Sequence, residues 1–404
     1  MVRTPLLPVA LLSWSVLFAA AATGCSSDDD EGALAPPDGV SCASVAGASD
    51  ESSLVSGLAN VGAGGCVVLT GSVTSSVPIV IDGVTLVGAK GTRPVLTAAP
   101  GTGGAITVTG DGSQLGNLDV TGARGVGVAI VARDVKVFDV VVSGAEKAAV
   151  AVVPGSEGAS SATLTDVVLE KNAYGLYVGG AGVEVTMSGG RVSENGGSSL
   201  SAGAGVVTTD GAKLTLDGVT VEKNEGTGVL LDGASTRAVI AASTISENRE
   251  RGVWAQGLQG TLDAPALRIE ETELSKNRIV GMGGIALKGI IIVGGSVKET
   301  VASPVPTNLA ATELIGDGVG IFGGSTDFKI ERTNFAANGR AAGVVDGSEV
   351  GIIIVGGKVE PGDSGLKFVV QNSKADVQIP DADKSTTTSP LGISAPKIQV
   401  PSAL

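Results

Sequence analysis

The chain has 404 residues, including 62 glycines, only ten aromatic residues (six Phe, two Trp and two Tyr) and no histidine. The lack of histidine excludes a Ser-His-Asp triad and every histidine-ligated metal centre, and we expect neither a metal nor another cofactor. The formal net charge of −14 argues against nucleic acid as a partner. The glycines follow no Gly-X-Y period, which excludes collagen, and 43% hydrophobic residues are too many for a disordered chain.

The first 24 residues have the pattern of an export signal. A single cation, Arg3, precedes an apolar run from Leu6 to Ala22, and small residues follow. This pattern is typical of a secretory signal peptide, residues 1–24, which is removed from the mature protein. The alternative is a transmembrane helix, but the run is short for one and lacks a charged flank on its far side.

The junction Ala22-Thr23-Gly24-Cys25 resembles the lipobox of bacterial lipoproteins. The resemblance implies that Cys25 carries fatty acyl chains such as palmitate, which would hold the protein to a membrane. Residues 25–41 are polar and contain prolines, so they predict a flexible tether. Ser26, where Asp would signal inner-membrane retention in some Gram-negative lipoproteins, favours the outer membrane. We therefore expect a cell-envelope protein, on either the periplasmic or the external side.

Two cysteines remain if Cys25 carries lipid. Cys42 and Cys66 form an even pair in an exported chain, which indicates a disulfide. A catalytic thiol is the alternative, but no histidine is present to lower its pKa. The disulfide would tie the start of the fold, which we expect the weakly helical segment Ser49–Asn60 to cap, to the first strand, Val67–Leu69.

The rest of the mature chain is a repeat. Short apolar triplets, each preceded by a turn, recur at a mean spacing of about 28 residues, which is typical of solenoids. The last residues of the ten triplets are Leu86, Val120, Val142, Leu169, Val192, Val221, Ile245, Leu274, Leu314 and Phe335. The units are rich in Gly, Val and Thr and lack a 3.6-residue pattern, which argues against helical repeats.

From the fourth copy onward, a corner residue follows each triplet by three positions. These residues are Asn172, Asn195, Asn224, Asn248, Asn277, Asp317 and Asn338. Asn and Gly tolerate the left-handed conformation that a tight corner needs, and a glycine soon leads into the next strand. Asn side chains at the same corner of successive coils can stack as a hydrogen-bonded ladder.

The strand–Asn-x-x-x-Gly–strand unit resembles the parallel β-helix repeat of the pectate-lyase-like superfamily, over roughly residues 66–370. The resemblance implies an all-β fold, a right-handed single-stranded parallel β-helix (a solenoid) of about ten coils with a short N-terminal cap. We expect it to span residues 42–379, and residues 380–404 to form a loose tail. The superfamily includes lyases, hydrolases and adhesins, so the resemblance does not decide the function.

Two further features concern the register of the coils. The phrase Gly-Ile-Ile-Ile-Val-Gly-Gly occurs at residues 289–295 and again at 351–357, 62 residues later, so its copies are expected to stack two rungs apart. The segment Ser296–Thr307, which contains Pro304 and Pro306, is expected to be a loop inserted in the longest coil.

Carboxylates in the central coils are a candidate catalytic set. The resemblance implies two kinds of enzyme: hydrolases that use clustered Asp with a His, and lyases that use calcium with an Arg or Lys base. The candidates are Asp210, Asp217, Asp232, Asp263, Glu247, Arg237, Arg249 and Arg251. Asp217 and Asp232 precede glycines, where such a side chain commonly caps its own turn. Neither a dense Asp cluster nor a lyase-type Arg pattern is visible, so we assign no catalytic residue.

One column of side chains is expected to point outward, counting alternation from each glycine after the corner. It contains Tyr177, Val207, Leu230, Trp254, Ala286 and Phe322. Aromatic faces spaced along a groove can stack on sugar rings, and Tyr177 and Trp254 would lie three rungs, or about 14 Å, apart. Tyr177, Trp254 and Phe322 are therefore candidate glycan-binding residues. Alternatively, they pack beneath a loop or a neighbouring turn.

These features favour a lipid-anchored envelope protein whose β-helix serves as a non-catalytic scaffold or binding surface, with carbohydrate as the candidate ligand. The alternative is a polysaccharide lyase or hydrolase that acts on acidic glycans through a carboxylate/Arg site. Adhesion by lateral packing is a third interpretation.

Overall fold

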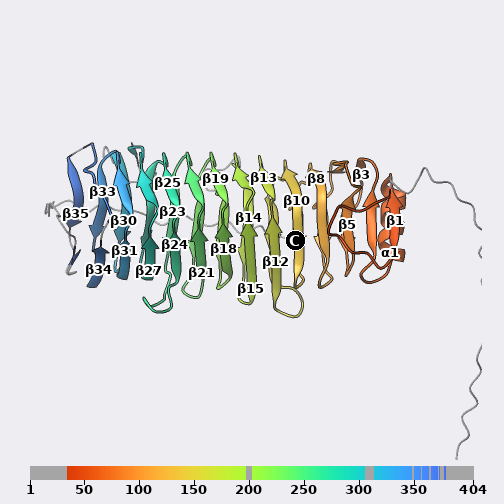
Figure 1. The fold of residues 1–404 in the computed structure, drawn as a ribbon, viewed down its shortest axis with the longest axis horizontal. Coiled ribbons are helices and arrows are strands. Elements are labelled where there is room, and N and C mark those ends of the chain that lie inside the picture. Colours follow the sequence, from red (N-terminus) through yellow and green to blue (C-terminus); the bar gives the residue numbers. More distant parts are fainter. Residues whose placement is uncertain are drawn as a thin grey trace, which may run out of the picture.

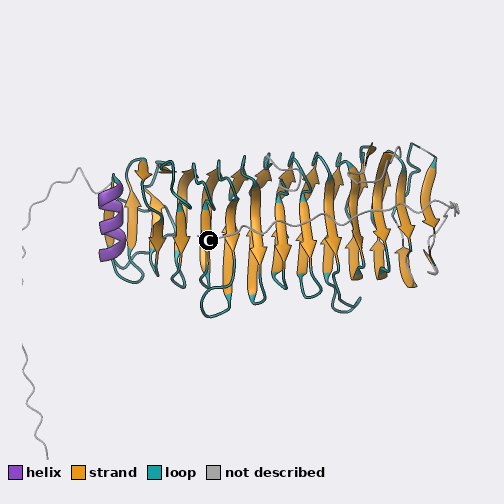
Figure 2. Cartoon of the chain, turned by 180° about the vertical axis from the view of Figure 1, so that it is seen from behind, coloured by secondary structure: helices purple, strands orange, loops and turns teal. Residues whose placement is uncertain are grey.

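The computed structural model describes residues 34–196, 203–304, 314–347, 350–355, 357–363, 365–371, 373 and 377–378. These residues form a long solenoid in which short strands lie side by side along the whole rod (Figure 1). One helix, α1 (Glu51–Asn60), lies across the N-terminal end (Figure 2). The signal peptide, Cys25 and the expected tail at 380–404 lie outside the described residues.

The strands form three parallel stacks. Stack A contains β1 (Val45–Ala48), β2 (Cys66–Leu69), β5 (Thr85–Gly88), β8 (Gln114–Thr121), β10 (Val135–Ser143), β12 (Ser160–Thr165), β15 (Val183–Ser188), β18 (Lys213–Asp217), β21 (Arg237–Ala241), β24 (Leu267–Glu270), β27 (Lys288–Val293), β31 (Thr326–Glu331), β34 (Val350–Val355) and β36 (Val377–Gln378). Stack B contains β4 (Ile79–Ile81), β7 (Ile106–Val108), β9 (Val128–Ile130), β11 (Ala148–Val152), β14 (Tyr174–Gly179), β17 (Val206–Thr209), β20 (Val229–Asp232), β23 (Arg251–Gln256), β26 (Ile279–Ile285), β30 (Leu314–Phe322), β33 (Ala341–Asp346) and β35 (Leu366–Gln371). Stack C contains β3 (Val73–Ser75), β6 (Val95–Ala98), β13 (Val168–Glu170), β16 (Arg191–Ser193), β19 (Thr220–Glu222), β22 (Thr244–Ser246), β25 (Glu273–Ser275), β28 (Ser296–Lys298) and β32 (Asn334–Ala336), and the long strands β8 and β10 run through both A and C.

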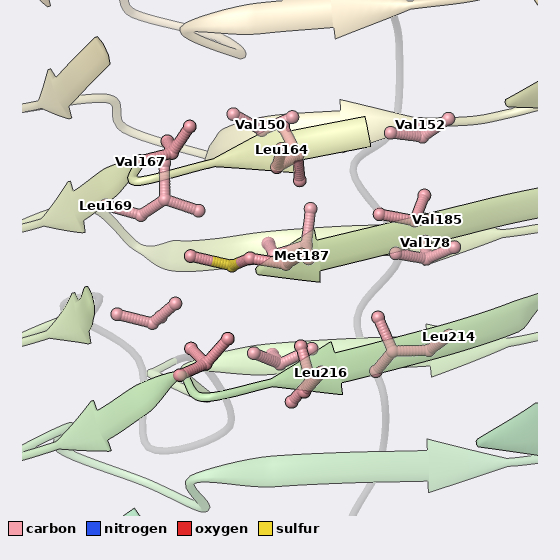
Figure 3. Packing of buried hydrophobic residues seen from close by; sticks show 14 of the residues in the cluster. Val150, Val152, Leu164, Val167, Leu169, Val178, Val185, Met187, Leu214 and Leu216 are labelled. Carbon is pink, nitrogen blue, oxygen red and sulfur yellow. The ribbon is translucent and has the colours of Figure 1, made fainter. Parts of the chain in front are cut away.

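The interior is filled by alternate residues of every strand. In most of the described strands one face carries Val, Leu or Ile, and these side chains form a single buried cluster along the rod. Figure 3 shows how Val150 and Val178 of stack B lie near Leu164, Val185 and Met187 of stack A. Burying one such side chain stabilises the fold by about 1.5–3 kcal/mol, so a narrow core of aliphatic residues is sufficient without many aromatic ones.

The repeat is confirmed, and the structure corrects its register at two places. Leu96 lies opposite Val120, so Leu96 belongs to the stacked column formed by the last residues of the triplets, which we call the marker column, and Leu86 does not. Val297 lies between Leu274 and the next marker, so the marker of that coil is Val297 in place of Leu314. Val73 lies opposite Leu96, and Val359 lies opposite Phe335, so the column continues by one coil at each end. Stack B has twelve strands in sequence, and the described solenoid has twelve coils where about ten were expected.

The expected inserted loop at Ser296–Thr307 is wrong at its beginning. Ser296–Lys298 is strand β28, which pairs in parallel with β25 and β32. The extra length of this coil follows it, where β29 (Ser303–Pro304) pairs antiparallel with the start of β30. The expected stacking of the two Gly-Ile-Ile-Ile-Val phrases is correct, because Ile290 lies opposite Phe328 and Phe328 lies opposite Ile352.

The N-terminal cap combines a helix and a disulfide. Asp50 begins α1 with a capping box in which its side chain accepts a hydrogen bond from the backbone of Ser53. The Cys42–Cys66 disulfide is present, with 5.4 Å between the Cα atoms. Strand β1 precedes β2, so the strand at 66–69 is the second of its stack. No helix in the described ranges is long and apolar enough to cross a membrane.

The expected tether is shorter than residues 25–41, because its last part packs on the solenoid. Val40 packs beside the buried Val68 and Val87 on the outside of stack A. The backbone N–H of Lys90 donates to the carbonyl of Ala35, and its ammonium pairs with Asp38 at 2.8 Å. Chain that was expected to be flexible is therefore ordered from Leu34.

The structure contains an Asn ladder at the corner between stacks C and B. From Asn195 to Asn277, each Oδ1 accepts from the backbone N–H and the side-chain amide of the preceding Asn, at 2.9 to 3.1 Å. At the two ends, the Oδ1 of Asn172 accepts from the backbone N–H of Ala145 and that of Asn338 from the backbone N–H of Thr300. The members are Asn172, Asn195, Asn224, Asn248, Asn277 and, after Thr300, Asn338. They are buried, and each side-chain amide of the run also donates to a main-chain carbonyl of a preceding coil. Such fully satisfied buried networks fix the register of neighbouring chain segments.

Two details of this corner differ from the expectation. Asp317 is outside the ladder: it lies on β30 opposite Val280, and Thr300 holds the ladder position of its coil. The left-handed residue is also a different one, because the residue before each Asn has the positive φ, 55° at Lys223 for example. The glycine after the corner is required for close approach, since a Cβ on Gly228 would lie 2.7 Å from the Asn248 amide nitrogen.

Candidate functional site

The outer face of stack B carries a continuous column of side chains. Val206, Leu231 and Val253 point into the core, so the residues that alternate with them point outward. Strand pairing places one outward residue of each strand in register, and we call this set the outer column: Val80, Thr107, Ala129, Ala151, Tyr177, Val207, Leu230, Trp254, Gly283, Gly320, Val344 and Val369. Tyr177 and Trp254 are three rungs apart, as the sequence predicted.

The last two members of the predicted column are wrong. The residue opposite Trp254 on β26 is Gly283, and Ala286 lies beyond the strand with a φ of 54°. Gly320 is the column residue of β30, and Phe322 stands two positions further along on the same face. The sequence analysis counted from Gly284 and Gly320, but the glycines that follow the corner in these two coils are Gly281 and Gly318, so the counted positions were displaced along the strand.

The aromatic rings lie flat on this face above glycines. A Cβ on Gly179 would lie 2.7 Å from the Tyr177 ring, and a Cβ on Gly320 would lie 2.5 Å from the Phe322 ring. Gly283 is similarly close to Trp254, at 3.1 Å. The rings of Trp254 and Phe322 are neighbours, with centroids 6.3 Å apart. Glycines therefore make room for aromatic rings to cover the bare backbone of the sheet.

The outer column is buried along most of its length, although it faces away from the core. Its exposed fraction is 52% at Val80, 5% at Ala129, 2% at Tyr177, 0% at Trp254 and 6% at Val369. The outward residues form a second apolar cluster, distinct from the core. The expectation of rings open to solvent is therefore wrong, and the alternative that the rings pack under other chain atoms agrees with their burial. Burial also raises the pKa of the Tyr177 hydroxyl to about 12.

Charged groups are buried beside the outer column. Arg251 is stacked over the Trp254 ring at 4.6 Å and pairs with Glu250 at 2.8 Å; burial lowers the pKa of this guanidinium. Asp317, two rungs away, is fully buried and receives a bidentate pair of hydrogen bonds from Arg340. Burial raises the pKa of Asp317, and the Arg340 hydrogen bonds oppose that shift. The face therefore combines apolar rings with desolvated charges, and each of these charges is paired, as burial of a charge requires.

Comparison with known proteins identifies the architecture. A family model described as a right handed beta helix region matches residues 104–303. The chain is a right-handed parallel β-helix protein. The expected resemblance to the β-helix repeat of the pectate-lyase-like superfamily is thus confirmed at the level of fold. No curated protein matches the sequence.

Several solved structures share this fold at low sequence identity. The catalytic domain of a GH87 α-1,3-glucanase in complex with nigerose is 13% identical with a TM-score of 0.56, over 87% of this chain and 69% of that one. The Dettilon tailspike protein is 14% identical with a TM-score of 0.53, over 80% and 62%. The A-module of the mannuronan C-5 epimerase AlgE4 of Azotobacter vinelandii is 15% identical with a TM-score of 0.48, over 87% and 98%. At this identity the likeness shows the fold alone.

The β-helix protein does not bring the candidate carboxylates together as a set, although Asp210 and Asp232 lie on neighbouring coils at the ends of β17 and β20. Asp217 and Arg237 lie on the outside of stack A, Asp232 lies at the end of β20 in stack B, and Glu247 is a corner residue. Arg249 pairs with Glu225 on the surface. Within the described ranges, no three acidic or cysteine side chains are grouped closely enough to hold a metal ion.

The sequence analysis missed a row of alternating charges on the β-helix protein. The left-handed residues that directly precede successive ladder positions are Lys171, Glu194, Lys223, Glu247, Lys276 and Glu299. Neighbours in this row approach each other, with 3.9 Å between Lys171 Nζ and Glu194 Oε2. The row could have been found in the sequence, because every member stands immediately before a ladder residue. The alternation places opposite charges next to each other on a 4.8 Å repeat, which favours the correct stacking of coils.

Proposed function

We propose that the mature protein is a lipid-anchored, non-catalytic scaffold of the cell envelope, attached to the outer membrane through Cys25. Two features support this proposal: the lipobox-like junction of the sequence, and a solenoid of twelve coils that would form a stiff rod about 50 Å long. Only eight residues, 26–33, separate Cys25 from Leu34, so the anchor would hold this rod close to the membrane surface.

The ligand we propose for the scaffold is an extended carbohydrate chain, bound along the outer face of stack B. The observation that carries this part is the in-register face with the rings of Tyr177, Trp254 and Phe322 laid flat over glycines. The shared fold with a glucanase domain solved with nigerose supports the ligand class. Because the rings are buried, a glycan would have to replace the atoms that cover them.

The proposed role is binding without turnover. Many carboxylates on the outside of the described coils are engaged in ion pairs between coils, such as Asp119 with Arg93 and Asp111 with Arg133. These pairs stabilise the stacking of coils and hold the carboxylates away from a common centre. This arrangement supports a scaffold over the alternative of a lyase or hydrolase.

Glycan binding can be tested with the mature chain from Cys25 to Leu404. We expect binding to an acidic or neutral polysaccharide on a glycan array, without calcium-dependent release of unsaturated sugars. Tyr177→Ala with Trp254→Ala should weaken binding at least tenfold, whereas Thr163→Ala with Thr215→Ala on stack A should leave it unchanged. Circular dichroism would verify that both variants fold. Sugar release by the intact chain would contradict the proposal.

The anchor can be tested separately from the ligand. Cells that express the full chain should incorporate labelled palmitate into the protein, and the protein should fractionate with the outer membrane. Cys25→Ser should abolish the label and release the protein in soluble form. Persistent membrane association of Cys25→Ser would contradict lipid anchoring.

A further inference from the structure

The row of alternating charges lies at one edge of stack C, and we call it the charge row. Its members are the left-handed residues Lys171, Glu194, Lys223, Glu247, Lys276 and Glu299. The backbone N–H of each member donates to the following coil in one repeating pattern, so the charges recur at a step of about 4.8 Å. All six side chains are exposed, with an exposed fraction of 62% at Lys171 and 47% at Glu299. The charge row is therefore open to a partner.

The charge row and the outward residues of stack C belong to one face. Lys171 Nζ lies 3.7 Å from Glu170 Oε1, and Lys223 Nζ lies 3.6 Å from Glu222 Oε2. Both distances are longer than a hydrogen bond, so each ammonium group can also bind a carboxylate from another molecule. From β12 to β28, only two residues separate each strand of stack A from the following strand of stack C. The strands of stack C, such as β13, β19 and β25, thus form a continuous strip along the rod with short turns at that border (Figure 1).

The charges of this strip are complementary to the same strip in reverse order. The charge row reads Lys, Glu, Lys, Glu, Lys, Glu, and in reverse it reads Glu, Lys, Glu, Lys, Glu, Lys. A two-fold axis perpendicular to the rod, between the coils of Lys223 and Glu247, would place each row of one copy against the same row of a second copy in reverse. The facing pairs of the charge row are then Lys171 with Glu299, Glu194 with Lys276, and Lys223 with Glu247.

The two outward columns of stack C obey the same symmetry. Strand pairing places Arg191 and Glu273 in one column, one coil from its second and second-last positions in this range, so they face each other. Glu170 and Lys298 are the first and last residues of the other column, and they also face each other. Opposite charges therefore meet in all three rows.

The turn between stacks A and C adds no repulsion to this arrangement. Its left-handed residues include two acids, Asp166 and Glu271. In the same antiparallel pair, Asp166 would face Gly294 and Glu271 would face Gly189, which occupy the equivalent turn positions of their coils. Both acids thus meet residues without charge.

Other arrangements of two copies bring like charges together. In a parallel pair with its two-fold axis along the charge row, each residue would face its own counterpart. In an antiparallel pair shifted by one coil, Lys171 would face Lys276, and Glu194 would face Glu247. Like charges directly opposite each other are destabilising, so the pattern selects the unshifted antiparallel pair.

We propose that two copies of this chain pair antiparallel through the outer faces of their C stacks. The face spans six coils and six residues, about 29 Å by 20 Å, or on the order of 600 Å² on each copy. A standard interface buries about 800 Å² on each partner, so the pair is weak and its geometry is set by charge. The inference goes beyond the proposed function, because it concerns another face and requires neither a glycan nor an anchor.

Charge reversal tests the facing pair at the centre. Sedimentation velocity of residues 25–404 with Cys25→Ser should show a monomer–dimer equilibrium at low ionic strength, and its Kd should rise at least tenfold in about 0.5 M salt. Lys223→Glu and Glu247→Lys should each raise the Kd at least tenfold, because each places like charges opposite each other. An equimolar mixture of the two variants should pair as tightly as the natural chain, since the new acid of one copy faces the new cation of the other.

Matched reversals on stack A are the controls. Lys213→Glu and Glu184→Lys change the net charge by the same amounts, and we expect each to change the Kd less than about twofold. Circular dichroism would verify that all variants fold. A chain that remains monomeric at millimolar concentration would overturn the proposal. Equal effects of the reversals on stacks A and C, or a mixture that fails to pair, would overturn it as well.

Cross-linking tests the direction of the pair independently. Val168 and Ser296 are the first and last residues of one outward column of stack C, so they face each other in the antiparallel pair. With a short bismaleimide, a mixture of Val168→Cys and Ser296→Cys, both in the Cys25→Ser chain, should form a covalent dimer. Neither variant should do so alone, because its two thiols would lie about five rungs, or 24 Å, apart. Cross-linking of either variant alone would indicate a parallel pair and would contradict the proposal.

Discussion

The outer faces of stacks A and B have the same parallel-strand backbone, but one is charged and exposed and the other is apolar and buried. On stack A, the outward residues Glu184 and Lys213 form an exposed ion pair between neighbouring coils. On stack B, Val207 and Trp254 are buried, and the fully buried carboxylate of Asp317 is paired with the partly exposed Arg340. Since both stacks have the same parallel ladder, the difference arises from the side chains and from the atoms that cover them. A β-helix can thus have one face suited to water and another that is stable only when covered.

The largest expected effect is on stability, when the buried carboxylate of Asp317 loses its cation; the exposed Glu184–Lys213 pair on stack A is the comparison. Arg340→Ala should reduce the free energy of unfolding by about 3–5 kcal/mol at pH 7, because it leaves the fully buried Asp317 carboxylate without its cation. Urea unfolding followed by circular dichroism would measure the change. A loss below about 1 kcal/mol would mean that Asp317 is hydrated, and the contrast between the faces would fail.

The loss of stability caused by Arg340→Ala should depend on pH. Burial raises the pKa of Asp317 above its usual value of 3.8, and hydrogen bonds from Arg340 lower it. A carboxyl whose folded-state pKa is raised stabilises the fold below the unfolded pKa, and this contribution is lost as pH rises through the folded pKa. Arg340→Ala should therefore cost little at pH 4 and show its full cost at pH 7. Equal costs at both pH values would contradict this assignment.

Trp254→Ala should reduce the free energy of unfolding by about 3–4 kcal/mol, since it removes a fully buried aromatic side chain. The matched change on stack A is Thr215→Ala, which we expect to alter stability by less than about 0.5 kcal/mol. Thermal or urea unfolding of both variants provides the measurement. Similar small losses for the two would show that the outer column is open to water.

Gly320→Ala tests whether the rings are held flat against the sheet. The new methyl group would lie 2.5 Å from the Phe322 ring, so the ring must move, at a cost of about 1–2 kcal/mol. In a Phe322→Ala background the cost should largely disappear, because no ring occupies the space. A double-mutant cycle without coupling would rule out the packing that we describe.

The smallest effect is expected on stack A. Lys213→Ala removes an exposed ion pair with Glu184 and should cost less than about 0.5 kcal/mol, with no remaining difference from the unmodified protein in 1 M salt. Chemical denaturation by urea at two salt concentrations would measure this. A salt-independent loss above 1 kcal/mol would place this pair among the buried interactions instead.

The sequence predicted the features that depend on local chemistry. Asn at the corners, apolar triplets and the Cys42–Cys66 pair are each visible as short patterns with a physical requirement behind them. Leu86 and Leu314 misled the register because β8 runs through two stacks and an extra segment follows β28. The count of coils fell short because Val73 and Val359, at the two ends of the column, are not among the ten triplets. Neither feature has a local signature in the sequence.

The burial of the site could not be read from the same patterns. Alternation correctly places Trp254 on the outside of its strand, but it does not indicate which atoms bury the indole ring. Asp317 stands three positions after an apolar triplet, as a ladder residue would, and only the strand pairing of β30 places it beside Val280. Local rules thus give the direction of a side chain and do not give what it meets.

The most direct test of the account uses the fluorescence of Trp254, the single tryptophan of residues 25–404. Emission maximum and quenching by acrylamide would be measured on the intact protein from Cys25 to Leu404. A covered outer column predicts emission at short wavelength and quenching at least fivefold weaker than for free tryptophan. Emission at the wavelength of free tryptophan, with full quenching in a chain that is folded by circular dichroism, would contradict it.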